Sequence, residues 1–369
     1  MAQSGTQCSY ALFKVRLQGL YRAALAPVLD RLWISKNVFI MKWGIIGPGD
    51  IARNFVRDFS ELSSLQQVSA IYNHRKKTAK EFADEFGVNE VFTDLDSFIR
   101  EGDAEIVYIS TPHTKHYDEV KACLAAGLHV LCEKPMAINR RQYEELYELA
   151  AMKNVYLLEG MWLRFLPHIT RLLEQTEAGT IGRPLSLKAS MCYQAPKDPD
   201  SRYFDPELGG GSLLDLGVYT VFLAVLLFGK PDSIAVTAHL TDQGIDDCCA
   251  ILLGYADGRH ALLESSLLYN TQQPAVLTGE KGEIHILTPW FEKSPGLEIY
   301  PSEGGEPIRR PVEWQGHGLH FEAAAVLDDI AAGRTSNSLF TPAMSLEIIT
   351  VMDEIRRQAG IGYDEEEKT

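Results

Sequence analysis

The chain has 369 residues, of which 46% are apolar and 23% charged, and its formal net charge is −15. This length favours two domains with a substantial core. The acidic balance argues against a nucleic-acid or anionic-membrane partner, because both require a basic surface. The six cysteines have no zinc-finger spacing, which indicates reduced thiols, a cytoplasmic protein and no metal site.

Residues 1–40 differ from the rest of the chain. They carry five Lys or Arg residues and one acid, Asp30. Such an amphipathic, acid-poor segment is typical of an organellar transit peptide. Because patterns typical of folded domains begin only at Met41, we prefer the alternative that Met41 is the true start and that residues 1–40 are a wrongly assigned extension.

A dinucleotide-binding pattern begins directly after Met41. Residues 42–46 predict a short strand, and the letters GPGDIA that follow fit G-x-G-x-x-G/A with a helix behind them. The first glycine allows a tight turn, and the second lets a pyrophosphate approach the backbone at the helix N-terminus. We therefore expect the cofactor to contact Gly47, Gly49, Asp50 and Ile51.

The end of the next predicted strand, residues 67–73, indicates which dinucleotide binds. An NAD site usually has an acidic residue there for the ribose 2′-hydroxyl. This chain instead has Asn73, His74 and Arg75, followed by two lysines. Hydrogen-bond donors and positive charge suit a 2′-phosphate, so we predict NADP(H), with NAD as the alternative. An exposed basic helix start would also explain these residues.

Alternating strands and helices continue to about residue 162. We expect helices at 78–86, 95–100, 117–126 and 140–152 and strands at 90–92, 105–111, 129–132 and 154–160. Such alternation predicts a parallel sheet whose ligands bind beyond the carboxyl ends of the strands. Five residues would face the cofactor there: Thr111, Pro112, His116, Glu133 and Lys134. A histidine at a helix start with only a structural role is an equal alternative for His116.

A Rossmann domain at 41–162 would thus be followed by a second domain at 163–369. The crossing segment EGMWLRFLP contains Trp162, Arg164 and Phe165, which either line a substrate cleft or pack the junction; its Pro167 reads as a break. Five runs of strand length follow, at 183–193, 232–241, 247–256, 259–269 and 282–287, with helices at 319–332 and 343–358. They predict an α+β domain with a largely antiparallel sheet, whose uncovered face favours a homo-oligomer, with a dimer preferred.

The apolar stretch 213–228 is too short for a typical membrane helix and contains Asp215, so we predict a buried core helix and no membrane partner. It follows three glycines that permit close backbone approach, and Ser212 is a candidate N-cap. Asp215 and Tyr219 are four residues apart and would share one helix face. A buried acid is costly unless it is paired, so a functional pair competes with an Asp that satisfies backbone amides beside an ordinary core tyrosine.

The segments GIIGPGDIA, CEKP and GGGSLLDLGVY, in this order and spacing, resemble the glucose–fructose oxidoreductase/inositol dehydrogenase (Gfo/Idh/MocA) family from Met41 to about Tyr363. The closest resemblance is to its dimeric dihydrodiol dehydrogenases and NADP-dependent D-xylose dehydrogenases. It implies that Lys134, Asp215 and Tyr219 form the catalytic group. Many other members have histidine where this chain has Tyr219, and this departure points to the branch with tyrosine.

The resemblance implies hydride transfer between a nicotinamide and the hydroxyl or carbonyl of a sugar, polyol or trans-dihydrodiol. We assign Tyr219 as general acid/base, Lys134 as the ammonium that lowers its pKa and binds substrate, and Asp215 as a holder of the lysine or of a sugar hydroxyl. Tyr219 and Lys134 could exchange roles. A dinucleotide-binding regulator without catalysis remains an alternative, as does a reductase of ketosugars or unsaturated tetrapyrroles.

Overall fold

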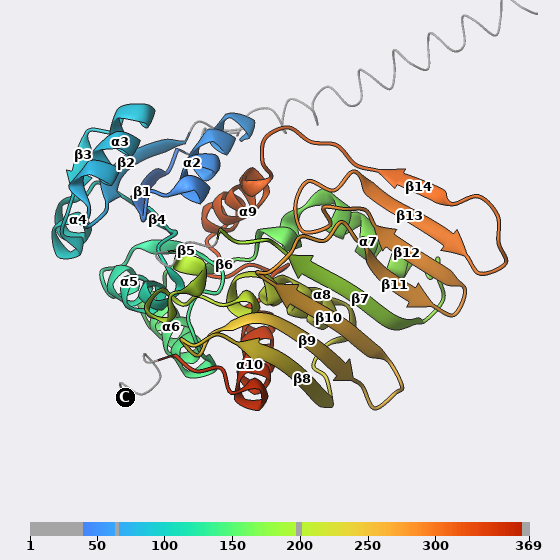
Figure 1. Cartoon of the computed structure of the whole chain (residues 1–369). Coiled ribbons are helices and arrows are strands. Elements are labelled where there is room, and N and C mark those ends of the chain that lie inside the picture. Colours follow the sequence, from blue (N-terminus) through green and yellow to red (C-terminus); the bar gives the residue numbers. More distant parts are fainter. Residues whose placement is uncertain (1–39, 63–65, 197–200, 364–369) are drawn as a thin grey trace, which may run out of the picture. The chain divides into compact units, whose positions relative to one another are not determined.

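The computed structural model describes residues 40–62, 66–196 and 201–363 (Figure 1). The basic segment before Met41 therefore lies outside the described residues, and both interpretations of it stay predictions.

The first sheet has six parallel strands in the order β3-β2-β1-β4-β5-β6. Its strands are β1 (Lys42–Ile46), β2 (Gln67–Tyr72), β3 (Glu90–Phe92), β4 (Ile106–Ile109), β5 (His129–Glu133) and β6 (Leu157–Gly160). The helices between them are α2 (Asp50–Arg57), α3 (Lys76–Phe86), α4 (Leu95–Glu101), α5 (His113–Ala125) and α6 (Arg140–Lys153), with the 3-10 turn η1 (Asp58–Glu61) after α2. This arrangement confirms the predicted Rossmann fold.

Apolar residues on both faces of the central strands explain why the sheet is parallel and covered by helices. All four residues of β4 are buried, as are the last four of β1 and of β5. In the sheet register Ile46 pairs with Ile109, and Ile109 pairs with Cys132. The chain therefore leaves these three strands at one edge, which brings Gly47, Ser110 and Glu133 together.

The second sheet has eight strands in the order β14-β13-β12-β11-β7-β10-β9-β8. They are β7 (Pro184–Cys192), β8 (Ser233–Leu240), β9 (Asp246–Gly254), β10 (His260–Ser266), β11 (Ala275–Gly279), β12 (Gly282–Ile286), β13 (Gly296–Pro301) and β14 (Ile308–Pro311). β10 runs parallel to β7, and the other pairs described in this sheet are antiparallel. The sheet is thus mostly antiparallel as predicted, although β11, β13 and β14 were missed.

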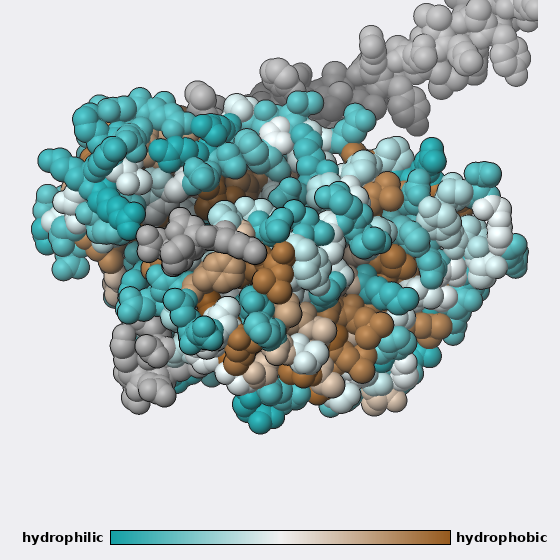
Figure 2. All heavy atoms as spheres, viewed as in Figure 1, coloured by the Kyte–Doolittle hydropathy of each residue, from teal (hydrophilic) through white to brown (hydrophobic). Residues whose placement is uncertain are grey.

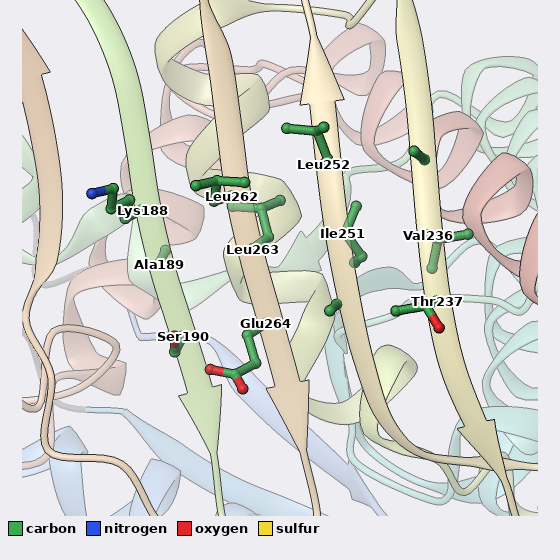
Figure 3. A pocket seen from close by; sticks show the side chains of 12 residues that line it. Lys188, Ala189, Ser190, Val236, Thr237, Ile251, Leu252, Leu262, Leu263 and Glu264 are labelled. Atoms are coloured by element: carbon green, nitrogen blue, oxygen red, sulfur yellow. The ribbon is translucent and has the colours of Figure 1, made fainter.

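Helices cover one face of this sheet and leave the other face open (Figure 1). The helical segments are α7 (Pro167–Glu177), α8 (Val218–Phe228), α9 (Leu319–Ala331) and α10 (Pro342–Ala359), with the short turns η2 (Trp162–Phe165), η3 (Arg202–Phe204), η4 (Pro206–Leu208) and η5 (Leu213–Gly217). Leu252 and Leu262 project from the open face, with Lys188 and Glu264 nearby (Figure 3). Figure 2 shows apolar side chains gathered over β8, β9 and β10.

Three local predictions were wrong. Pro167 does not break the chain but begins α7, where its missing N–H is not needed. α5 begins at His113, four residues earlier than expected, so His113 and His116 belong to the helix. Ser212 does not cap a helix, because its hydroxyl donates to Asp246 Oδ2 at 2.6 Å.

The apolar helical stretch Pro206–Phe228 is long and apolar enough to cross a membrane by composition. However, 89% of its 18-residue window is buried inside the protein, where α8 packs against α10 and the sheet. This burial agrees with the prediction that the stretch is a core helix.

Candidate functional site

A cavity of about 600 Å³ lies at the edge where β1, β4 and β5 end, and the second domain closes it from the other side. Its lining comes from the glycine loop, the start of α5, the end of β5, and the segment around η3 and η5. The residues are Gly49, Asp50, Ile51, Asn54, Ser110, Thr111, Pro112, His113, His116, Glu133, Lys134, Arg202, Tyr203, Asp215, Tyr219 and Glu292.

The glycine loop has the shape that a dinucleotide pyrophosphate requires. Gly47 has φ of +79°, and a Cβ there would lie 2.7 Å from the backbone nitrogen of Thr111. A Cβ on Gly49 would meet nothing nearer than Gly47 O at 4.0 Å. The space above Gly49 is therefore open, in front of the N-terminus of α2, where a dinucleotide pyrophosphate fits.

The residues predicted to select the 2′-phosphate lie at the end of β2 and outside the cavity. Asn73 Oδ1 accepts the backbone N–H of Arg75 at 2.7 Å, which forms a tight turn. His74, Arg75 and Lys76 are exposed beyond this turn, and within the described chain neither Arg75 nor Lys76 forms an ion pair. Arg75 and Lys76 are therefore two exposed cations without an ion pair in the described chain. They lie at the end of β2, where a Rossmann domain binds the adenosine ribose.

Lys134 and Asp215 meet across the two domains. The ammonium of Lys134 donates to the backbone oxygen of Asp215 at 2.8 Å and lies 3.4 Å from its Oδ1. Asp215 sits in the π-helical turn η5, a geometry often found at functional sites because it changes the usual carbonyl pairing. The lysine at the end of β5 is therefore a buried charge with a fixed position, not a solvated loop residue.

Asp215 is surrounded by three basic side chains. Besides Lys134, Arg202 lies 3.3 Å from Oδ2, and His113 Nε2 lies 3.8 Å from Oδ1. Burial by itself would raise the pKa of Asp215, but the charges of Lys134 and Arg202 hold it well below its ordinary value. The carboxylate is therefore ionised, and the alternative in which it only satisfies backbone amides does not describe its contacts.

Tyr219 lies beside Lys134, with its ring 4.6 Å below the ammonium. Its hydroxyl oxygen accepts a hydrogen bond from Trp162 Nε1 at 2.8 Å. Burial and then the nearby Glu133 raise the pKa of Tyr219 well above 10, although the Trp162 bond opposes this. The expectation that the lysine lowers this pKa was wrong, because the ammonium lies over the ring face and burial outweighs it.

Glu133 lines the cavity and accepts the hydroxyl of Tyr108 at 2.5 Å. Burial raises its pKa, although the bond from Tyr108 and the charge of Lys134 oppose the rise. Glu322 on α9 is fully buried, and neither carboxylate oxygen has a hydrogen-bond partner among the described residues. Burial, followed by repulsion from Glu133, raises the pKa of Glu322 well above 4.5.

His116 has a fixed position in the cavity wall. Its Nδ1 lies 2.8 Å from Pro135 O and its Nε2 lies 2.7 Å from Thr111 O. Burial lowers the pKa of His116 to about 4. The ring connects the loop after β4 with the Glu-Lys-Pro turn, so it holds Thr111 and Pro112 in place as well as facing the cavity.

Arg164 and Phe165 are not in the cavity. The Arg164 guanidinium donates to Leu339 O at 2.9 Å, and Phe165 belongs to the hydrophobic core. For these two residues the packing interpretation holds. Trp162 does not line the cavity, but it contacts the site through Tyr219.

His113 and Arg202 were missed in the sequence. His113 follows the predicted Thr111-Pro112 pair, so a correct helix start would have drawn attention to it. Arg202 lies in an irregular segment with no periodic pattern, and only folding brings it to Asp215.

Comparison with known proteins agrees with this geometry. Residues 41–161 match the family model of the oxidoreductase family with an NAD-binding Rossmann fold, and residues 169–285 match the GFO/IDH/MocA C-terminal domain. A trans-1,2-dihydrobenzene-1,2-diol dehydrogenase from Mus musculus is 30% identical over 337 residues, which cover 89% of this chain and 99% of the relative. The chain belongs to the Gfo/Idh/MocA family.

A further relative and two solved structures of similar fold differ in the compounds that they bind or act on. A scyllo-inositol 2-dehydrogenase (NADP(+)) from Bacillus subtilis is 30% identical over 336 residues, covering 88% of this chain and 98% of the relative. The crystal structure of KijD10, a 3-ketoreductase from Actinomadura kijaniata, with NADP and TDP-benzene has a TM-score of 0.78 at 24% identity, covering 87% of this chain and 98% of that one. A levoglucosan dehydrogenase with NADH and levoglucosan reaches 0.77 at 21% identity, with the same coverage. This Gfo/Idh/MocA member is therefore an NAD(P)-dependent oxidoreductase.

Proposed function

We propose that this protein is an NADP-dependent dehydrogenase that transfers hydride between the nicotinamide and a CH–OH or C=O group of a sugar, polyol or trans-dihydrodiol. The observation that carries the proposal is the contact of Lys134 with Asp215 and Tyr219 in one cavity. A regulator that only binds a dinucleotide needs the glycine loop but has no use for a buried, oriented ammonium beside a phenol.

A bound nicotinamide supplies the hydride acceptor or donor at this edge of the sheet. Tyr219 keeps its proton because of its raised pKa, and its oxygen already accepts from Trp162, so its O–H is free to donate to a substrate oxygen. In reduction Tyr219 gives this proton to the carbonyl oxygen as hydride adds to the carbon, which leaves a tyrosinate; in oxidation the tyrosinate takes the hydroxyl proton back as hydride leaves the carbon. The Lys134 ammonium, held by Asp215, stabilises negative charge on the same oxygen.

Preference for NADP is supported by His74, Arg75 and Lys76 at the end of β2 and by the absence of an acid among residues 73–77. Arg75→Ala should reduce the ratio of kcat/KM for NADP+ over NAD+ by about tenfold, the loss of one charge-assisted hydrogen bond. Lys77→Ala is the matched control, because Lys77 points to Glu81 at 3.8 Å. Equal use of both cofactors by the wild type would contradict the preference.

The first experiment on activity follows nicotinamide absorbance with the full chain, NADP+ or NAD+, and D-xylose, D-glucose, myo-inositol and a trans-dihydrodiol. Turnover that disappears in Lys134→Met, while NADPH binding is retained, is the expected result. If wild type and variant both bind NADPH and both lack turnover, the regulator alternative replaces the dehydrogenase.

We also propose a homodimer through the open face of the second sheet. Leu252 and Leu262 are 44% and 43% exposed there and line a shallow groove with Ala235 and Ala250 (Figure 3). Leu252→Glu should convert a dimer to a monomer in light scattering, whereas Leu339→Glu, at an exposed leucine away from this sheet, should not.

We propose the cytoplasm as the location of the protein. The five described cysteines are free, which suits this reducing compartment.

A further inference from the structure

The turn η5, which carries Asp215, is anchored from the side of the sheet by a second buried carboxylate. Asp246, the first residue of β9, is fully buried and does not line the cavity. Its Oδ2 accepts the hydroxyl of Ser212 at 2.6 Å and the backbone N–H of Leu213 at 2.7 Å. These two residues lead directly into Asp215, so Asp246 holds the start of the turn that reaches the site.

Leu213 is fixed at both of its backbone groups. Its N–H donates to Asp246, and its backbone oxygen accepts the N–H of Val218, which is the pairing of a π-helical turn. Asp215 lies between Leu213 and Val218, and its backbone oxygen accepts from the Lys134 ammonium at 2.8 Å. The bond from Leu213 to Asp246 therefore helps to set the direction of the carbonyl group that orients the lysine.

Two glycines let this turn lie close against the sheet. Gly211 has φ of +112°, and a Cβ there would lie 2.5 Å from Asp246 Oδ1. A Cβ on Gly217 would lie 3.1 Å from the Ser265 hydroxyl oxygen of β10. The turn is thus packed tightly against β9 and β10 on both sides of Asp215, so a change at Asp246 is transmitted to it.

The contacts of Asp246 are not those of a residue that serves folding alone. Its Oδ1 is buried and accepts no hydrogen bond from the described residues. A buried acceptor without a donor is costly, and such costs are typical of places where function requires a particular geometry. The next residue, Asp247, differs, because its Oδ1 lies 2.9 Å from His239 Nδ1.

We infer that Asp246 is a positioning residue for the reaction, which holds η5 so that Asp215 orients the Lys134 ammonium toward the reacting oxygen. The inference rests on the proposed function, because it takes that oxygen to lie at Lys134 and Tyr219. A displaced ammonium stabilises the charge that develops during hydride transfer less well, and the rate falls. The glycine loop that faces the cofactor lies on other elements, so cofactor binding is independent of Asp246.

The test uses the full chain, NADP+ and the compound that the wild type turns over fastest. The value of kcat is expressed per chain that binds NADPH, which removes any unfolded fraction. Asp246→Ala should lower kcat by at least about tenfold, while the Kd for NADPH stays within about twofold of the wild type. Asp246→Asn keeps an acceptor for both donors, so its kcat should stay within about threefold of the wild type. Ser212→Ala removes one donor and should lower kcat by about threefold or more.

Asp247→Ala is the matched control. Asp247 is also a buried aspartate of β9, and among the described residues its carboxylate bonds to His239 and not to the turn. Its replacement should leave kcat at the wild-type value even if it lowers the melting temperature as much as Asp246→Ala does.

The outcomes separate the two proposals. A wild-type kcat in Asp246→Ala, or an equal loss in Asp246→Asn or in Asp247→Ala, overturns the positioning role and leaves the dehydrogenase intact. If Asp246→Ala does not bind NADPH, Ser212→Ala decides instead, and an unchanged kcat in that variant overturns the role. No turnover of any compound by a wild type that binds NADPH overturns the proposed function, and the positioning role with it.

Discussion

The indole N–H of Trp162 donates to the hydroxyl oxygen of Tyr219 at 2.8 Å, although the two residues are 57 positions apart and belong to different segments of the fold. The bond fixes the phenol and leaves its own O–H as the free donor. It also opposes the rise in the pKa of Tyr219 that burial causes, because an N–H donor stabilises the phenolate.

Trp162→Phe keeps an aromatic side chain but removes the indole N–H donor. We expect kcat to fall by about tenfold, the value of one hydrogen bond of about 1.4 kcal/mol, and any basic limb of the pH–rate profile to move to higher pH. The measurement is the pH dependence of kcat at saturating NADP+. In a Tyr219→Phe background the same substitution should have almost no further effect, and an undiminished effect there would show that Trp162 acts by packing alone.

Replacing each of the two loop glycines by alanine should affect a different property, folding stability at one position and NADPH binding at the other. Gly47→Ala places a Cβ 2.7 Å from the Thr111 backbone at a φ of +79°, so it should cost about 2 kcal/mol or more of folding stability. Gly49→Ala meets no protein atom nearer than 4.0 Å, so it should leave stability unchanged but weaken NADPH binding at least tenfold. Urea unfolding and fluorescence titration measure the two effects. If the Gly49→Ala protein binds NADPH as tightly as the wild type, the pyrophosphate does not bind at this loop.

Three buried histidines should make the protein sensitive to acid. Burial lowers the pKa of His113 to about 3 and of His116 and His168 to about 4. The unfolded chain takes up these protons near pH 6.5, so the stability is complete above that pH and is lost as the pH falls toward 4. Each histidine contributes up to about 1.4 kcal/mol per pH unit in this window.

Urea unfolding between pH 7 and pH 5 measures that loss. His168→Gln should reduce the slope of stability against pH by up to about 1.4 kcal/mol per pH unit, whereas His260→Gln, at an exposed histidine, should leave it unchanged. A slope that is the same in both variants would mean that other groups carry the acid sensitivity.

Asp58 lies in η1, directly after α2, and connects this part of the Rossmann domain with the start of α9. Its Oδ2 accepts the backbone N–H groups of Gly318 and Leu319 at 2.8 and 2.9 Å, and its Oδ1 accepts that of His317 at 2.8 Å. Burial would raise the pKa of Asp58, but these bonds and those from the side chains of His317 and His320 keep it below 3.8. The resulting stability is therefore present above pH 4 and lost in stronger acid.

Asp58→Asn should cost about 2 to 4 kcal/mol at pH 7, because the new NH₂ group faces N–H donors. Asp94→Asn is the matched control: Asp94 caps α4 by accepting from Ser97 N at 2.9 Å, and asparagine caps a helix nearly as well. Its expected cost in urea unfolding is below about 1 kcal/mol. Equal costs for the two variants would contradict the special role of the Asp58 contacts.

Much of the fold was predictable because its signals are local. The strand at Lys42–Ile46, the glycine turn after it and the position of Lys134 at the end of β5 depend on neighbours in the chain, and β1 and β3 were predicted with their observed bounds. Strands β11, β13 and β14 were missed because short runs with glycine and charged residues have no clear alternation. Their places come from pairing: β11 pairs with β7, β13 with β12, and β14 with β13.

The sequence by itself determined the family, the Rossmann sheet and three members of the site, because close backbone approach and strand-end position follow from residue types at short spacing. Only the tertiary structure decided what these members do to one another. Lys134 is 81 positions from Asp215, and its ammonium lies over the Tyr219 ring and not at its hydroxyl. The pKa of Tyr219 therefore rises where a local argument expected a fall, since burial and long-range charge arise only when the two domains close around the site.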